Sequence, residues 1–155
     1  MKIYHDGNFK FNYEEMCSND TMEEYRNSPI LTSELLYNTG WALHALNKRF
    51  DAGSVVLFSE LCFSKDMWNA VNYARLWPEA HYPEVDAILQ DALGHLGDAH
   101  YMIDHVYHST LDGVPKKVHR AYNSITIEVR AGLVFIREAI MLIDNYIDDA
   151  LGGKK

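Results

Sequence analysis

The chain has 155 residues, of which 48% are hydrophobic, and its 14 basic and 22 acidic side chains leave a formal net charge of −8. That length suits one domain with a core of its own, and the apolar fraction excludes an intrinsically disordered chain. The negative charge argues against binding to nucleic acid and to an anionic membrane surface.

Residues 1–27 are expected to form an amino-terminal arm that packs on the rest of the protein. The dipeptide Asp6-Gly7 is typical of a type I′ turn, and it would pair Tyr4 with Phe9 in a short β-hairpin. An irregular arm is the alternative, because an isolated two-stranded ribbon is only marginally stable in water.

The cysteines and the apolar segments bear on the cellular compartment. Cys17 and Cys62 are far apart in the sequence, so neither a disulfide framework nor a zinc site is indicated. The first residues lack the apolar run of a signal peptide, and no segment approaches the roughly 20 apolar residues of a membrane span. We therefore expect a cytoplasmic protein.

Residues 28–155 are expected to form a single helical domain. Ser28 and Pro29 are typical of the N-cap and first position of a helix. The segment 54–77 is interpreted as one helix, with a break at Ser64 as the alternative, and Pro78 and Pro83 are expected to bracket a turn. The predicted helices span residues 29–50, 54–77, 85–111 and 115–151.

Each predicted helix has an apolar stripe, which is clearest in the third. There the stripe repeats at alternating intervals of four and three residues: Val85, Leu89, Ala92, Leu96, Ala99, Ile103 and Val106. Four helices joined by short turns bury their stripes most simply as antiparallel neighbours. We predict an all-α fold, an antiparallel four-helix up-down bundle with a short arm or β-hairpin at its amino terminus.

The third helix also carries a candidate metal site. His100, Asp104 and His108 follow one another at intervals of four residues, so they lie along one flank of the helix and could present three ligands. The alternative interpretation is a solvated flank of Asp-His pairs. The chain contains neither Glu-x-x-His nor His-Glu-x-x-His, which excludes the di-iron carboxylate and zincin patterns, and no cofactor is identified.

A candidate anion site lies at the start of the fourth helix, where Lys116, Lys117, His119 and Arg120 gather. Cations at a helix amino terminus oppose the helix dipole, whereas free backbone N–H groups beside them could hold a phosphate or carboxylate. The alternative is a screened cluster of surface charges.

The fourth helix has a second apolar face. Ile127, Val134 and Met141 recur at intervals of seven residues almost opposite the inward stripe, with Phe135 and Leu142 beside them. Because soluble monomers rarely leave such a patch in water, we predict a two-fold symmetric homodimer formed through these five residues. The alternative is that the amino-terminal arm covers this face.

No motif in the sequence establishes catalysis. The first hypothesis for the function is therefore a homodimeric interaction or small-ligand-binding module. The alternatives are an enzyme acting on an anionic, phosphorylated small substrate near His108, Lys116 and His119, with metal assistance or through histidine chemistry, and a toxin- or antitoxin-like partner of another protein.

Overall fold

The structure is a computed structural model that describes residues 22–51, 58–111 and 118–150. These residues contain helices and no strands, which confirms the all-α class. The helices are α2 (Met22–Asn27), α3 (Pro29–Asp51), α4 (Phe58–Tyr73), α5 (Leu76–His81), α6 (Pro83–Leu111) and α7 (Val118–Ala150). The predicted hairpin at Asp6-Gly7 lies outside the described residues.

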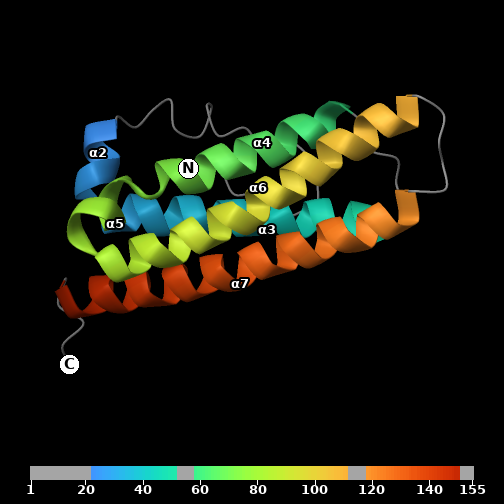
Figure 1. The fold of residues 1–155 in the computed structure, drawn as a ribbon. Helices are drawn as coiled ribbons and strands as arrows, with labels where there is room; N and C mark the ends of the chain where they lie inside the picture. Colours follow the sequence, from blue (N-terminus) through green and yellow to red (C-terminus); the bar gives the residue numbers. More distant parts are fainter. Residues whose placement is uncertain (1–21, 52–57, 112–117, 151–155) are drawn as a thin grey trace.

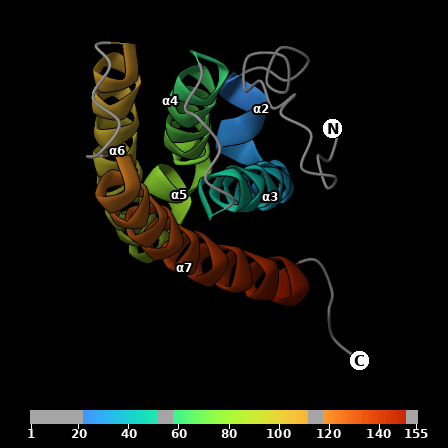
Figure 2. The ribbon, with the colours of Figure 1, turned by 90° about the vertical axis from the view of Figure 1, so that its right-hand side faces the viewer.

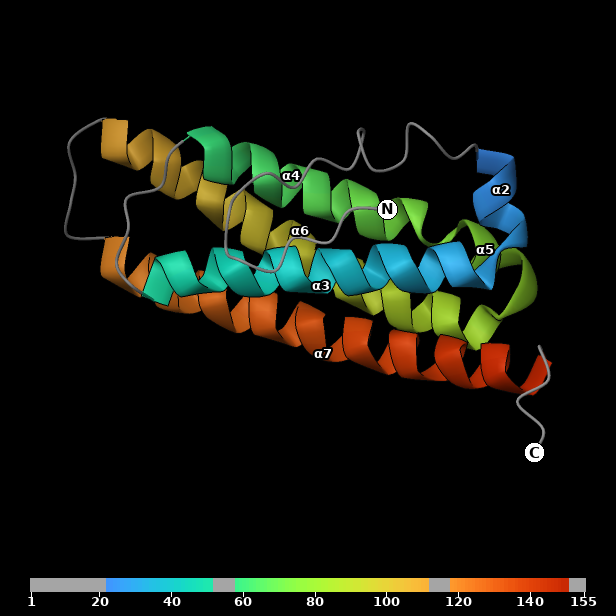
Figure 3. The same cartoon turned by 180° about the vertical axis from the view of Figure 1, so that it is seen from behind.

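The long helices α3, α4, α6 and α7 pack side by side, and each one runs opposite to the one before it (Figure 1). The view from behind shows α3 lying along α7 (Figure 3). Viewed end-on, α7 runs obliquely from beneath α6 toward α3 (Figure 2). The regular four-helix bundle stays a prediction, because α7 is inclined and the short helices α2 and α5 also join the packing.

The start of α3 agrees with the prediction from sequence. The Ser28 hydroxyl accepts a hydrogen bond from the Leu31 backbone N–H at 3.1 Å, and Pro29 occupies the first helical position. This is the N-cap arrangement, which satisfies one of the backbone donors that a helix leaves free at its start. The predicted helix from residue 29 to about 50 is therefore confirmed.

The region between α3 and α6 differs from the prediction. Helix α4 continues through Ser64 without a break, and the interruption falls at residues 74–75. The cause is Pro78, whose ring would clash with the carbonyl of Ala74 four residues earlier in a continuous helix. Instead Pro78 lies in the first turn of α5, where its missing N–H costs no helical hydrogen bond, so residues 78–81 are helical where a turn was expected.

Helix α2 was not expected from the sequence, which assigned residues 22–27 to the arm. Its Tyr25 is fully buried and meets Tyr73 of α4 edge to face, with ring centroids 4.8 Å apart. α2 packs against α5 and α3. Six residues are too few for a stable isolated helix, so this packing is what holds it.

The apolar stripes of α6 and α7 form the centre of the core. All seven stripe residues predicted for α6 are buried, as are Tyr122, Ile125, Val129, Ile136 and Ile143 of α7. The two helices approach closely at Gly132, where a Cβ atom would lie 2.8 Å from Cδ2 of Leu96. Only glycine fits this contact without a shift of Leu96, and this close packing helps to set the position of α7.

Candidate functional site

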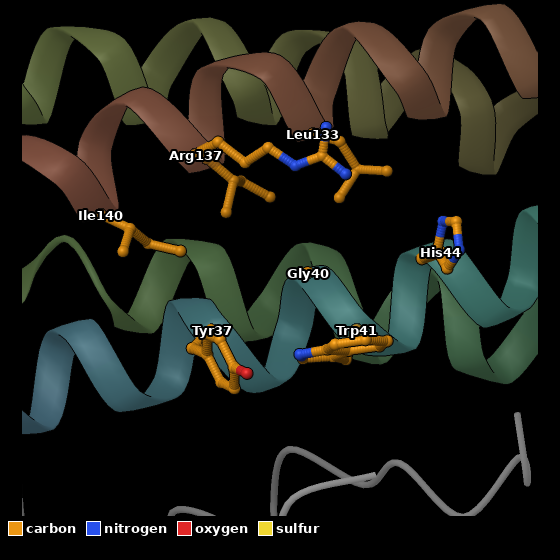
Figure 4. Close-up of a pocket in the computed structure, with 8 residues that line it drawn as sticks. Tyr37, Gly40, Trp41, His44, Leu133, Arg137 and Ile140 are labelled. Carbon is orange, nitrogen blue, oxygen red and sulfur yellow. The ribbon is translucent and has the colours of Figure 1, made fainter. Parts of the chain in front are cut away.

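The main candidate site is a groove between α3 and α7, which we call the α3/α7 groove. Its first half is a cavity of about 290 Å3, and Figure 4 shows side chains of α3 along one edge and of α7 along the other. The lining residues are Tyr37, Gly40, Trp41, His44, Leu133, Ile136, Arg137 and Ile140. A cavity with mostly apolar walls and few polar groups is typical of small-molecule sites.

The α3 edge of this cavity is aromatic. Tyr37, Trp41 and His44 follow at intervals of four and three residues, so they share one face of the helix. Their rings meet edge to face, with centroid separations of 6.3 Å from Tyr37 to Trp41 and 6.2 Å from Trp41 to His44. These contacts hold the rings in place as one wall of the groove.

Gly40 keeps the groove open beside this aromatic edge. A Cβ atom at this position would lie 3.8 Å from Leu133 Cδ2 and 4.0 Å from Ile136 Cγ2, which are ordinary van der Waals contacts. A larger side chain would project into the space between α3 and α7. The glycine therefore provides volume on the groove floor without being needed for backbone conformation.

The groove continues past His44 into a second, more polar half with a cavity of about 380 Å3. It is lined by His44, Asn47, Lys48, Arg130, Leu133, Val134 and Arg137. His44, Leu133 and Arg137 line both halves. Among the described residues, the permanently charged side chains that line this half are all cations, a local excess of positive charge in a chain of net charge −8.

Asn47 lies in the wall of this cationic half and is 5% exposed. Its side-chain amide donates a hydrogen bond from Nδ2 to the backbone carbonyl oxygen of Thr126 on α7, at 3.3 Å. This contact sets the orientation of the amide. The buried Oδ1 has no hydrogen-bond partner among the residues that the structure describes.

The three residues of the candidate metal site, His100, Asp104 and His108, do not converge on one point. His108 Nε2 lies 3.3 Å from Asp104 Oδ1, whereas Nδ1 of His100 lies 2.6 Å from the Ser64 hydroxyl on α4. Among the side chains that the structure describes, no group of three or more from histidine, cysteine, aspartate or glutamate is arranged to hold a metal ion.

His100 is half-buried between α4 and α6. Burial lowers the pKa of its imidazole below the usual 6.5, and the nearby positive charge of Lys65 lowers the pKa further. The carboxylate of Asp104 opposes both effects but is the smallest of the three influences. His100 therefore favours the neutral form, in which it hydrogen-bonds to Ser64 and links two helices.

The residues predicted to form a dimer interface lie on or beside the outer face of α7. Ile127, Val134 and Met141 have exposed fractions of 59%, 60% and 58%, and we call these three the outer row. Phe135 and Leu142 are half-buried and pack against the core. Val134 also lines the cationic half of the groove, so the outer row and the groove adjoin.

His95 of α6 covers the half-buried Phe135. The two rings stack with centroids 5.6 Å apart and planes inclined by 13°, and Nδ1 of His95 lies 3.0 Å from Oε2 of Glu128. This histidine is therefore engaged in α6–α7 packing.

The residues of the candidate anion site are not described well enough to test that prediction. Lys116 and Lys117 lie outside the described residues, as do the side chains of His119 and Arg120.

Reasoning from sequence missed the α3/α7 groove and gave His44 no role in a binding site. A signal was present, because Gly40 interrupts a helix whose Tyr37, Trp41 and His44 share one face. A glycine within such a pattern indicates either close helix packing or open space. Only the position of α7 shows that Gly40 lines a groove, where a Cβ atom would make ordinary contacts with Leu133 and Ile136.

Comparison of the chain with family models, with curated proteins and with solved structures finds no match in any of the three. Among the described residues, no helix has the length and apolar character needed to span a membrane.

Proposed function

We propose that the protein is a small-ligand-binding module and that its ligand occupies the α3/α7 groove, with an apolar body and an acidic group. The observation that carries the proposal is that the lining of one groove changes from apolar to cationic along its length. The half beside Trp41 is mostly apolar, while the half beside Lys48 is cationic. A ligand that is apolar at one end and anionic at the other matches this order.

Arg137 has the central role in this proposal, because it lines both halves of the groove. A guanidinium group can donate two parallel hydrogen bonds to a carboxylate, and such charge-assisted bonds are stronger than neutral ones. Leu133, Ile136 and Ile140 would remove the apolar body from water, at about 25 cal/mol for each Å2 buried.

The test is calorimetric titration with decanoate and decan-1-ol, which share one hydrocarbon chain and differ in the acidic group. We expect decanoate to bind more tightly, and Arg137→Gln to weaken its binding about tenfold or more while leaving decan-1-ol little changed. Arg26→Gln is the matched control, since Arg26 is exposed on α2 away from the groove. The proposal fails if neither probe binds, or if both arginine variants weaken decanoate equally.

We further propose that the protein is a homodimer joined through the outer row and that its long helices form an antiparallel four-helix bundle. Three large apolar side chains exposed along one face of α7 support the dimer, because leaving them in water is unfavourable.

We also propose that the protein is cytoplasmic. The free, exposed thiol of Cys62 is compatible with a reducing compartment.

Sedimentation equilibrium tests the dimer. We expect the wild type to have the mass of two chains and Val134→Glu the mass of one, with unchanged helical content. Met22→Glu is the control, because it adds the same charge at an apolar α2 residue that is 50% exposed. A wild type with the mass of one chain would exclude the dimer.

A further inference from the structure

Two cations of the α3/α7 groove have no carboxylate partner among the described residues. Lys48 of α3 and Arg137 of α7 both line the cationic half, and both are exposed, so a ligand in the groove can reach their charged ends. Neither forms an ion pair with any residue that the structure describes. By contrast, Arg49 of α3 lies 2.9 Å from the buried carboxylate of Glu60.

Among the described residues that line the groove, no acidic side chain balances this positive charge. The lining of the two halves includes Arg130 as a third permanent cation and contains no aspartate or glutamate. His44 lines both halves and adds a further positive charge when it is protonated. Several cations gathered without an acid favour a ligand that carries more than one negative charge.

We propose that the acidic group of the ligand is a phosphate monoester with two negative charges, held between Arg137 and Lys48. The inference rests on the proposed function and narrows its ligand class to soluble phosphate monoesters with an apolar body. A guanidinium group donates two parallel hydrogen bonds to phosphate oxygens, and a lysine ammonium group neutralises the second charge as a compact point charge.

The position of Arg137 allows one ligand to use both halves of the groove. Arg137 lines both halves, whereas Lys48 lines only the cationic half. A phosphate group bound where the two halves meet therefore has Arg137 beside it and Lys48 on its cationic side. The apolar body then extends the other way, past Trp41 and Ile140, which lie on the two edges of the apolar half (Figure 4).

The test is calorimetric titration at about pH 8 with decyl phosphate and decyl sulfate. The two probes share one hydrocarbon chain and a tetrahedral head group, but at this pH the phosphate carries nearly two negative charges and the sulfate carries one. We expect the wild type to bind decyl phosphate about tenfold more tightly, because its second charge meets a second cation.

Lys48→Met removes one charge and keeps a side chain of similar length, so the ratio of the two affinities should fall toward one. Lys65→Met is the matched control and should keep the wild-type ratio, because Lys65 is exposed on α4 and does not line the groove. A ratio that Lys48→Met leaves unchanged would argue against the role of Lys48 and overturn the inference.

The remaining outcomes separate the inference from the proposed function. Equal binding of decyl phosphate and decyl sulfate by the wild type overturns the inference but leaves the proposed function standing. Binding to vesicles that contain phosphatidate, without binding of soluble decyl phosphate, also overturns it, because the phosphate would then belong to a membrane surface. If neither probe binds and decanoate does not bind either, both the inference and the proposed function fail.

Discussion

The contact at Gly132 offers a test of how closely α6 and α7 approach. Gly132→Ala would place a Cβ atom 2.8 Å from Cδ2 and 3.1 Å from Cγ of Leu96, whose side chain is buried and has little room to move. Overpacking of this kind costs about 1–3 kcal/mol. Alanine also gains about 1 kcal/mol over glycine in a helix, so we expect a net loss of roughly 0–2 kcal/mol.

Gly94→Ala is the matched control on α6, because a Cβ atom there meets nothing within 4 Å. It keeps the helix-propensity gain of about 1 kcal/mol without any overpacking. The difference between the two variants therefore isolates the steric cost, about 1–3 kcal/mol, or roughly 2–12 °C in Tm for a domain of this size. Urea unfolding followed by circular dichroism measures it. Equal stability of the two variants would refute the close approach of α6 and α7 at Gly132.

Three further predictions concern single contacts. His100 has a lowered pKa, so its stabilising effect is complete above about pH 6.5 and is lost as the pH falls through the folded-state pKa. Urea unfolding at about pH 7 and about pH 5 measures this effect. Between these pH values the free energy of unfolding should fall more for the wild type than for His100→Asn, and an equal fall would contradict the lowered pKa of His100. Asp86→Asn should lower the free energy of unfolding by about 1–3 kcal/mol. The Asp86 carboxylate accepts hydrogen bonds from Arg75 at 2.7 and 3.3 Å, and both side chains are largely buried. Unchanged stability in urea unfolding would mean that the pair contributes nothing. Ser28→Ala should lower the free energy of unfolding by about 1 kcal/mol, and Ser28→Gly by only a few tenths of a kcal/mol. Equal losses of stability in thermal unfolding would argue against Ser28 as the N-cap of α3.

Local rules were sufficient to predict most of the helices. Ser28 and Pro29 start α3 through a short-range hydrogen bond and a fixed dihedral angle, and both effects act within one turn. The stripe of α6 is visible in sequence because helical periodicity alone decides which side chains share a face. The same kind of rule could have placed the break before α5, because Pro78 and Ala74 are four residues apart and clash in any continuous helix.

Other features depended on contacts between distant parts of the chain. Helix α2 is too short to be stable alone, and it forms because Tyr25 is buried against Tyr73 of α4. His100 looked like one of three metal ligands in the sequence. In the structure its Nδ1 faces Ser64, which is 36 residues away, and no local pattern could have indicated that partner.

The amino-acid sequence by itself determined an all-α chain, the faces that each long helix buries and the apolar outer row of α7, because these follow from spacing within one helix. Only the tertiary structure decided where a ligand could bind. The α3/α7 groove joins side chains about 80 to 100 residues apart, and its shape depends on how far α7 lies from α3, a distance that core packing and not sequence spacing sets.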